Sequence, residues 1–217
     1  MQDQPIRRPL KTRQARWASA AASSVASLGI SPNHISILSV FFAAAAGLTI
    51  WTSGNIEQAA TKVGLLLFTA IFMQLRLLCN LLDGMVAVEG GKRTKSGEVY
   101  NDLPDRLSDV FILIPAGYSL PFSFGPELGW AAGVLAVMTA YVRVLAGSCG
   151  ATQDFCGPMA KPHRMATLTA ACLLACVEVF LAWPPRIIAL ALVVIVLGSL
   201  VTVFRRTFRL VRELESK

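Results

Sequence analysis

The stretch CNLLDGMVAVEGGKRTKSGEVYNDLPDRLSD, residues 79–109, sets four aspartates around a loop rich in glycine and basic residues. They are Asp83, Asp102, Asp105 and Asp109. The segments on both sides of the stretch are apolar and long enough to enter a bilayer. Carboxylates at the edge of a membrane are costly and usually functional, so these four are the first candidates for a site.

The whole chain is too apolar for an ordinary soluble domain. Of its 217 residues, 54% are hydrophobic and 15% are charged, and its mean hydropathy is +0.58. Soluble domains usually have about 25% charged residues. We therefore interpret the chain as an integral membrane protein. At this hydropathy the net charge of +7 favours anionic lipid headgroups, rather than nucleic acid, as partners.

Six segments are expected to cross the membrane as α-helices, because lipid offers the backbone no hydrogen-bonding partner. Their approximate ranges are 33–53, 59–88, 97–120, 128–146, 164–183 and 186–208. The second and third reach the length of about 20 residues that a span needs only when their polar ends are included. The sequence thus predicts an all-α integral membrane domain of six transmembrane helices over residues 31–217.

Residues 1–30 form a separate basic segment. Its basic side chains precede a weakly apolar run of small residues, and they are Arg7, Arg8, Lys11, Arg13 and Arg16. This pattern is typical of an interfacial helix on a membrane surface, with Trp17 at the level of the headgroups. The run is too weakly apolar to be a secretory signal.

Lysine and arginine predict the orientation of the spans. They gather in the N-terminal segment, in residues 92–95, near residues 161–164 and in the C-terminal tail, which all lie on one side if there are six spans. The positive-inside rule then places both termini in the cytoplasm. Trp51, Trp130 and Trp183 fall at the opposite ends of the spans. Two basic termini favour a bacterial inner membrane, although an organelle membrane stays an alternative.

Oxygen ligands recur at helical spacing in the second and third segments. Asn80 and Asp83 are three residues apart and Asn101 and Asp105 are four apart, so each pair shares one face of a helix. Two adjacent helices that present such ligands at one depth can hold a hard cation, Mg²⁺ or Mn²⁺. Asp102, beside the second pair, is a further candidate ligand.

Small and basic residues surround these ligands. Gly84, Ala87 and Gly97 remove side-chain bulk, so that a flat group can approach the two helices. Lys92 lies in the basic loop between them and is placed to meet phosphate. Together these residues predict a divalent metal that holds a diphosphate at the cytoplasmic interface.

The same residues resemble the signature of the CDP-alcohol phosphotransferases, D-x2-D-G-x2-A-R-x8-G-x3-D-x3-D. The spacing is kept from Asn80 to Asp105, and five of the eight identities match. The matching residues are Asp83, Gly84, Ala87, Gly97 and Asp105. The three departures are Asn80, Val88 and Asn101, where the family has Asp, Arg and Asp.

The resemblance implies six membrane helices and a transferase of phospholipid synthesis. Members of the family bind a CDP-linked lipid or alcohol with two divalent metals, an alcohol attacks the diphosphate, and CMP leaves. Asp105 would be the general base, and Asn80, Asp83 and Asn101 would bind metal. Gly84 and Ala87 would lie against the nucleotide. A homodimer is the expected assembly.

The departures leave three alternatives open, because each asparagine removes one negative charge from the metal site. The chain is an enzyme with one metal or an altered site, an enzyme whose site shifts to use Asp102, or an inactive relative. The inactive relative would act as a membrane scaffold or bind a nucleotide-linked lipid. A transporter is a further alternative, but few polar residues line the opposite halves of the helices.

A second basic group resembles the acceptor-side region of family members that use phosphorylated alcohols. Arg143, Lys161 and Arg164 are therefore candidates to bind the acceptor's phosphate or a lipid headgroup. Asp109 lies deeper in its segment and is interpreted as a structural partner of Arg76 or Arg143.

Overall fold

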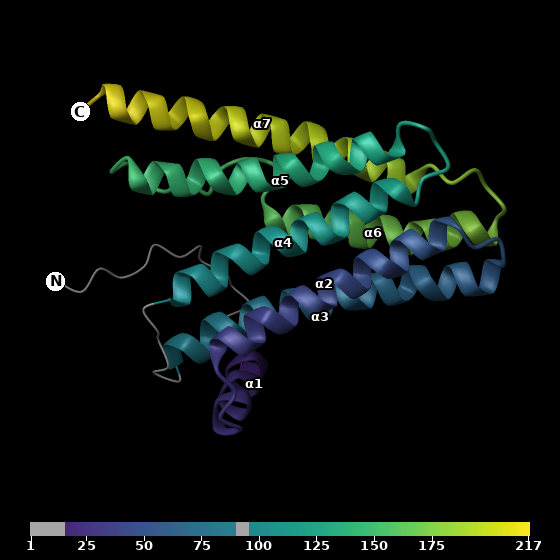
Figure 1. Ribbon diagram of the computed structural model, residues 1–217, viewed down its shortest axis with the longest axis horizontal. Coiled ribbons are helices and arrows are strands. Elements are labelled where there is room, and N and C mark those ends of the chain that lie inside the picture. Colours follow the sequence, from purple (N-terminus) through teal and green to yellow (C-terminus); the bar gives the residue numbers. More distant parts are fainter. Residues whose placement is uncertain (1–15, 90–95) are drawn as a thin grey trace.

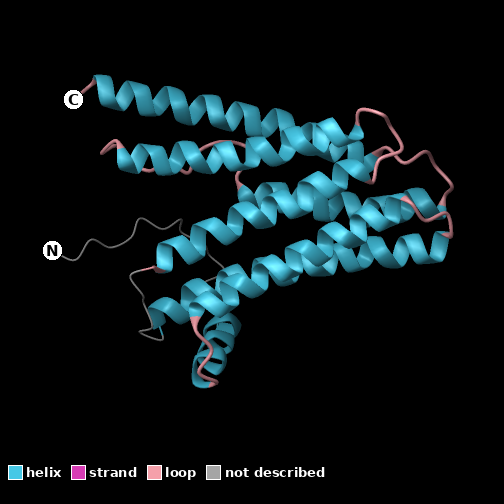
Figure 2. Cartoon of the chain, viewed as in Figure 1, coloured by secondary structure: helices cyan, strands magenta, loops and turns pink. Residues whose placement is uncertain are grey.

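The computed structural model describes residues 16–89 and 96–217. Over these residues the chain forms seven α-helices and no strand (Figure 2). The helices are α1 (Arg16–Ser27), α2 (Pro32–Gly54), α3 (Ala59–Glu89), α4 (Gly97–Tyr118), α5 (Gly125–Ser148), α6 (Lys161–Phe180) and α7 (Ile187–Glu215). The all-α prediction is confirmed for this part of the chain.

Helices α2 to α7 lie along one axis, and α1 stands at a steep angle to them near one end (Figure 1). Successive helices of the bundle run in opposite directions. The last turns of α3 and α7 and the first turns of α4 and α6 therefore lie in the same half of the bundle. This arrangement brings the two ends of the 79–109 stretch next to the basic residues of α6 and α7.

Five helices of the described chain are long and apolar enough to cross a membrane: α2, α3, α5, α6 and α7. They make the chain an integral membrane protein. The predicted third span, α4, does not meet the same standard of hydropathy, because its first half carries Asp102, Asp105, Arg106 and Asp109. Six transmembrane helices therefore stay a prediction.

Glycines bring α4 into close contact with α2 and α5. A Cβ atom at Gly47 of α2 would lie 1.9 Å from the Phe111 carbonyl oxygen of α4. A Cβ atom at Gly117 of α4 would lie 2.5 Å from the Gly125 carbonyl oxygen of α5. Small residues serve this purpose in membrane bundles, where backbones approach closely. The contacts fix α4, with its charged half, in the middle of the bundle.

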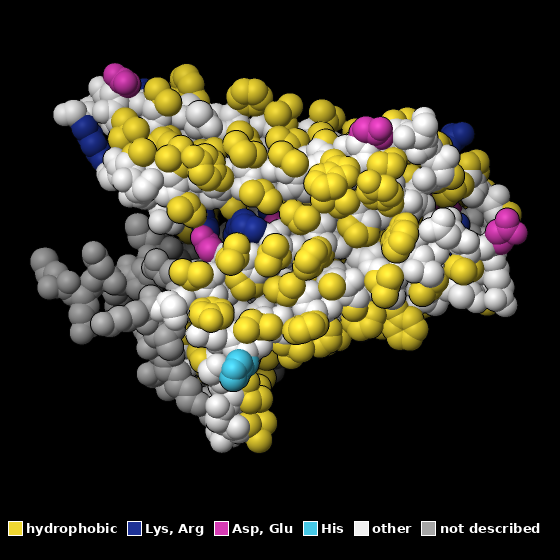
Figure 3. All heavy atoms as spheres, viewed as in Figure 1, with side chains coloured by type: hydrophobic (Ala, Val, Ile, Leu, Met, Phe, Trp, Pro, Cys, Tyr) yellow, Lys and Arg dark blue, Asp and Glu magenta, His cyan; other side chains and the backbone are white. Residues whose placement is uncertain are grey.

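Small and aliphatic side chains fill the interior of the bundle. Ala46 and Ile50 of α2, Ile112 of α4, Ala136 of α5 and Leu192 of α7 are all fully buried. Large apolar side chains remain exposed along the helices, and they cover much of the face in Figure 3. Such a surface suits hydrocarbon rather than water.

Helix α1 is the described part of the predicted N-terminal segment. Its Ala18 and Ala22 are buried in a small cluster with Ile35, Met85 and Val86, which attaches it to α2 and to the end of α3. Its position on a membrane surface stays a prediction. The basic residues before Arg16 lie outside the described residues.

Candidate active site

A cavity of about 270 Å³ lies in the half of the bundle where α3 ends and α4 begins. Helices α3, α4, α5, α6 and α7 all contribute to its wall. It brings together seven of the predicted site residues, which are Asn80, Gly84, Asn101, Asp105, Arg143, Lys161 and Arg164. Figure 3 shows acidic and basic side chains in a recess of the apolar surface between α4 and α5.

Asp105 lies at the wall of this cavity among three basic side chains. It is 8% exposed, and the Lys161 ammonium donates a hydrogen bond to its Oδ1 atom. Arg76 Nη2 lies 3.8 Å from Oδ1, and Arg106 Nη2 lies 3.9 Å from Oδ2. The carboxylate therefore has a cation near each oxygen, and these ion pairs fix its direction.

Asp109 lies one helical turn deeper and is fully buried between two arginines. Arg76 Nη2 donates to its Oδ1 at 2.9 Å, and Arg164 Nη2 donates to its Oδ2 at 2.6 Å. Arg164 also donates to Thr139 Oγ1 at 3.2 Å. This cluster joins α3, α4, α5 and α6 beneath the cavity floor. The predicted partner Arg76 is confirmed, whereas the second partner is Arg164 and not Arg143.

Asp83 is buried on the side of α3 that faces α2. Ser36 Oγ donates to its Oδ2 at 2.6 Å. Its Oδ1 has no hydrogen-bond partner among the described residues, and neither does Nδ2 of Asn80, one turn earlier. Buried polar atoms without partners are rare and require an explanation. A bound cation would give the Asp83 Oδ1 atom the partner that it lacks among the described residues.

Asp102 belongs to a different ion pair. Arg143 Nη2 lies 2.8 Å from its Oδ1 and 2.9 Å from its Oδ2, and Arg106 Nη2 lies 3.7 Å from Oδ1. Asp102 is not among the residues that line the cavity. Its carboxylate holds Arg143 in place over the ring of Phe155, 5.4 Å from the ring centre.

Comparison with known proteins places this geometry in context. No family model matches the chain. The inner membrane protein YnbA of Escherichia coli strain K12 is 29% identical over 139 residues, which are 62% of this chain and 63% of that protein, less than two thirds of its length. The phosphatidylinositol phosphate synthase of Mycobacterium marinum is 24% identical over 198 residues, which are 89% of this chain and 79% of that enzyme.

Two crystal structures of the phosphatidylinositol phosphate synthase of Mycobacterium tuberculosis share the fold. The structure with CDP-DAG bound has a TM-score of 0.73 at 22% identity and covers 90% of this chain and 94% of its own. The structure with manganese and citrate has a TM-score of 0.72 at 21% identity and covers 89% and 88%. These similarities support the resemblance to the CDP-alcohol phosphotransferases.

Asp83, Ala87 and Gly97 of the family signature are not among the residues that line the cavity. Ala87 lies in the last turn of α3 and Gly97 is the first residue of α4, at the edge of the same half of the bundle. Lys92 lies outside the described residues. The contact of Ala87, Gly97 and Lys92 with a nucleotide stays a prediction.

Arg206 is a wall residue that the sequence did not reveal. Its Nε donates to the Cys156 carbonyl at 2.9 Å, and its Nη1 donates to the Thr139 carbonyl at 2.6 Å. The sequence grouped it with the basic tail. The sequence did contain a signal that Arg206 is buried. One face of α7 repeats at helical spacing, and its buried residues are Ser199, Thr202, Arg206 and Leu210.

The described wall carries one acidic side chain, Asp105, and five basic ones, which are Arg106, Arg143, Lys161, Arg164 and Arg206. Such a surface favours a ligand with several negative charges, and planar guanidinium groups suit phosphate.

A second cavity, of about 260 Å³, shares Arg143 and Arg206 with the candidate active site. Asp154 lies in its wall and pairs with Arg209, whose Nη1 is 3.0 Å from Oδ2. Partial burial acts to raise the pKa of the Asp154 carboxyl, but hydrogen bonds from Cys156 and the pairing with Arg209 outweigh it and lower that pKa. This acid therefore stays ionised and offsets part of the positive charge.

The oxygen donors near the cavity suit a hard divalent cation. The described residues contain no group of three or more His, Cys, Asp or Glu side chains placed to hold a metal. The donors of the signature are instead two carboxylates, Asp83 and Asp105, and two amides, Asn80 and Asn101. All four offer oxygen, which Mg²⁺ and Mn²⁺ prefer, and the buried Oδ1 of Asp83 has no hydrogen-bond partner in the part of the chain that the structure describes.

Proposed function

We propose that the chain transfers a substituted phosphate from a CDP-activated donor to an alcohol, with release of CMP, in phospholipid synthesis. One observation carries the proposal: Asn80, Gly84, Asn101 and Asp105, at the spacing of the family signature, converge on one cavity with five basic side chains. The fold that it shares with an enzyme crystallised with CDP-DAG supports a CDP-linked lipid as the donor.

Asp83 and Asp105, with the amide oxygens of Asn80 and Asn101, would hold Mg²⁺ or Mn²⁺. A cation there would offset the charge of the diphosphate and make its phosphorus easier to attack. Gly84, Ala87, Gly97 and Lys92 would receive the nucleotide, because three of them lack bulk and the fourth is basic. The structure with manganese in the mycobacterial relative supports a divalent cation.

Asp105 would act as the general base. As the acceptor's hydroxyl oxygen forms its bond to the phosphorus next to the lipid, the hydroxyl proton passes to the Asp105 carboxylate. The bond between that phosphorus and the oxygen of CMP breaks, and CMP leaves with the electron pair. Lys161 now pairs with Asp105, so a phosphate in the cavity would draw Lys161 away and free an oxygen to accept the proton.

The acceptor is proposed to be a phosphorylated alcohol. Arg143 and Arg206 line both the candidate active site and the neighbouring cavity, so an acceptor that extends from one into the other would meet both. Lys161 and Arg164 of α6 add further positive charge to the wall of the candidate active site. The basic side chains of the wall outnumber its one acidic side chain, so a phosphorylated acceptor would add negative charge that a neutral alcohol lacks.

The membrane arrangement follows the same proposal. Helix α4 runs alongside the five apolar helices (Figure 1) and turns its acids toward other protein side chains, which supports six transmembrane helices in a domain of residues 31–217. Residues 1–30 would lie on the membrane surface. The Escherichia coli relative supports a bacterial inner membrane. Both termini would be cytoplasmic and the assembly a homodimer.

The test is release of CMP by the purified protein. The protein is given CDP-diacylglycerol, Mn²⁺ or Mg²⁺, and a panel of alcohols and phosphorylated alcohols, beside Asp105→Ala. Glu127→Ala is the control, because it removes an exposed carboxylate at the opposite end of the bundle. We expect metal-dependent release that Asp105→Ala lowers by about 10²-fold to 10⁴-fold, as loss of a general base does.

No release of CMP with any CDP-lipid or CDP-alcohol would overturn the proposal. Binding of CDP-diacylglycerol without release would favour the inactive alternative. Uptake of a labelled headgroup into proteoliposomes, without chemistry, would favour a transporter.

A further inference from the structure

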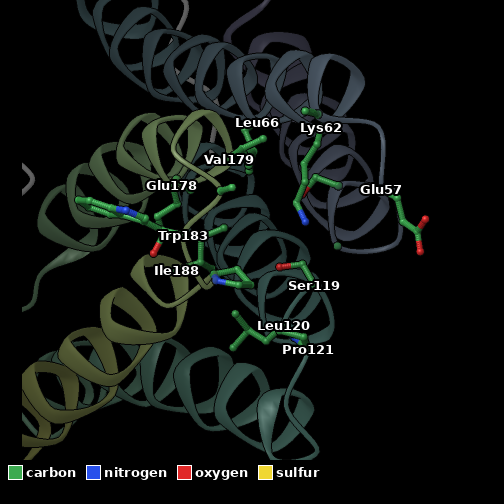
Figure 4. Close-up of a pocket in the computed structure, with 16 residues that line it drawn as sticks. Glu57, Lys62, Leu66, Ser119, Leu120, Pro121, Glu178, Val179, Trp183 and Ile188 are labelled. Carbon is green, nitrogen blue, oxygen red and sulfur yellow. The ribbon is translucent and has the colours of Figure 1, made fainter.

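A larger cavity, of about 380 Å³, lies at the end of the bundle opposite the candidate active site. The three connections at that end meet around it, between α2 and α3, between α4 and α5, and between α6 and α7 (Figure 4). None of the residues that line it belongs to the candidate active site. The cavity therefore needs an explanation of its own.

The walls of this cavity are mainly apolar. Leu66 of α3, Leu120 after α4, Val179 of α6 and Ile188 of α7 face it from four sides (Figure 4). Its volume is in the range of small-molecule sites, roughly 300–1,000 Å³. Walls of this kind suit the hydrocarbon and glycerol parts of a lipid.

Most polar groups in the wall are engaged within the protein. Ser53 Oγ donates to the Ile50 carbonyl at 2.6 Å, and Ser119 Oγ donates to the Ala116 carbonyl at 2.7 Å. The buried Glu178 accepts from the backbone N–H groups of Arg186 and Ile187, at 2.9 and 3.0 Å, at the start of α7. These groups are satisfied without a ligand.

Lys62 differs from them. Its side chain makes no hydrogen bond or ion pair with any residue that the structure describes. Figure 4 shows its nitrogen directed into the cavity toward Ser119, whereas the carboxylate of Glu57 is directed away from it. An ammonium among apolar walls is stabilised by an anion. The wall also contains Glu57 and Glu178, but Lys62 is the charged side chain that is directed into the cavity without a partner among the described residues.

We propose that this cavity binds an anionic phospholipid of the surrounding bilayer, with its phosphate on Lys62 and its glycerol and upper acyl carbons against the apolar walls. The site lies at a helix end of an integral membrane protein, where lipid headgroups are found. Basic pockets between membrane helices bind anionic headgroups in this way. The inference does not rest on the proposed enzymatic function.

Photo-crosslinking in lipid nanodiscs tests the proposal. The full chain is placed in phosphatidylcholine with a trace of phosphatidylglycerol, and a diazirine is carried by one lipid or the other. Labelled peptides are identified by mass spectrometry. We expect the phosphatidylglycerol probe to label residues 59–66 and 175–188 in preference to the phosphatidylcholine probe. Lys62→Gln should lower this labelling about fivefold, the effect of one lysine near a lipid surface.

Arg186→Gln is the matched control, because Arg186 is exposed on the same end of the bundle and does not line the cavity. It should leave the labelling unchanged. Ala59→Trp adds bulk at an exposed position of the wall and should lower labelling without removing charge. Equal labelling by the two probes, no effect of Lys62→Gln, or the same loss in Arg186→Gln as in Lys62→Gln would overturn the proposal.

Discussion

The charged side chains at the two ends of the bundle differ in whether they are paired. In the half that holds the candidate active site, each aspartate near the cavity except Asp83 is paired with lysine or arginine from another helix. At the opposite end, one lysine points into an apolar cavity without a partner among the described residues. At the first end these ion pairs form without a ligand. At the opposite end, a ligand would have to supply the counter-charge of Lys62.

The largest effect is expected on the free energy of unfolding, from a substitution in the half that holds the candidate active site. Asp109→Asn removes the ion-pair partner of the buried Arg164 guanidinium and leaves that of Arg76 with only Asp105, 3.8 Å away. Removing one partner of a buried ion pair costs about 3–5 kcal/mol. Thermal unfolding in detergent, followed by circular dichroism, measures the change. Asp154→Asn, which removes an acid from an exposed ion pair, should shift the unfolding temperature far less, and equal shifts would contradict the difference between buried and exposed pairs.

The next prediction tests whether Arg143 contacts the acceptor's phosphate or forms only a structural ion pair. Arg143→Gln should raise the KM for a phosphorylated acceptor about 10-fold to 100-fold, because a hydrogen bond to a charged group contributes about 1.5–3 kcal/mol. The KM for the CDP-lipid should change little. Steady-state kinetics with each substrate varied in turn measures both values.

Asp102→Asn is the control for that prediction, because it removes the partner of Arg143 and keeps the arginine. If Arg143 only anchors α5 to α4 through Asp102, the two variants will have the same KM values. If Arg143 binds the acceptor, Arg143→Gln will raise the acceptor's KM much more than Asp102→Asn does.

A smaller effect is expected on metal affinity. Asn101→Asp adds a carboxylate to the donors and should tighten Mn²⁺ binding on the order of tenfold, because the affinity of such sites follows the ligand charge. Asp83→Asn should weaken it. Electron paramagnetic resonance of free Mn²⁺ during titration measures binding without catalysis. Unchanged binding in Asn101→Asp would mean that this position does not face the ion.

The smallest effect concerns Asp154 and pH. Its pKa is lowered in the folded chain, so its contribution to stability is present above the pKa of the unfolded chain, about 3.9, and is lost as the pH falls below it. The unfolding temperatures of the native chain and Asp154→Asn should therefore differ slightly at pH 7, and the difference should shrink as the pH falls below about 3.9. A difference that grows in acid would contradict this assignment.

Local spacing predicted much of the fold and part of the site. The helices lie close to their predicted ranges, because long apolar segments with polar ends leave few other structures in lipid. The spacing of Asn80, Asn101 and Asp105 placed them on faces that do meet at one cavity. Their roles in metal binding and catalysis stay predictions.

Contacts between distant segments were not predictable from spacing. The face that Asp83 shares with Asn80 did not reveal that Ser36 of α2 would hold its carboxylate. Arg164 lies 55 residues from Asp109, and no local pattern connects them. The cavity around Lys62 is closed by three loops, whose packing depends on the whole bundle.

The glycine contact between α4 and α5 has a mechanical consequence. Near Gly117 and Gly129 the two backbones touch, with 2.6 Å between the Cα of Gly129 and the position that a Cβ of Gly117 would take. The helices cannot approach further there, and the short loop after α4 holds them together. Any widening of the candidate active-site cavity must therefore come from rotation of α4 and α5 about this contact. A small tilt at the glycines would become a larger opening between α4 and α5 where Asp102 now meets Arg143.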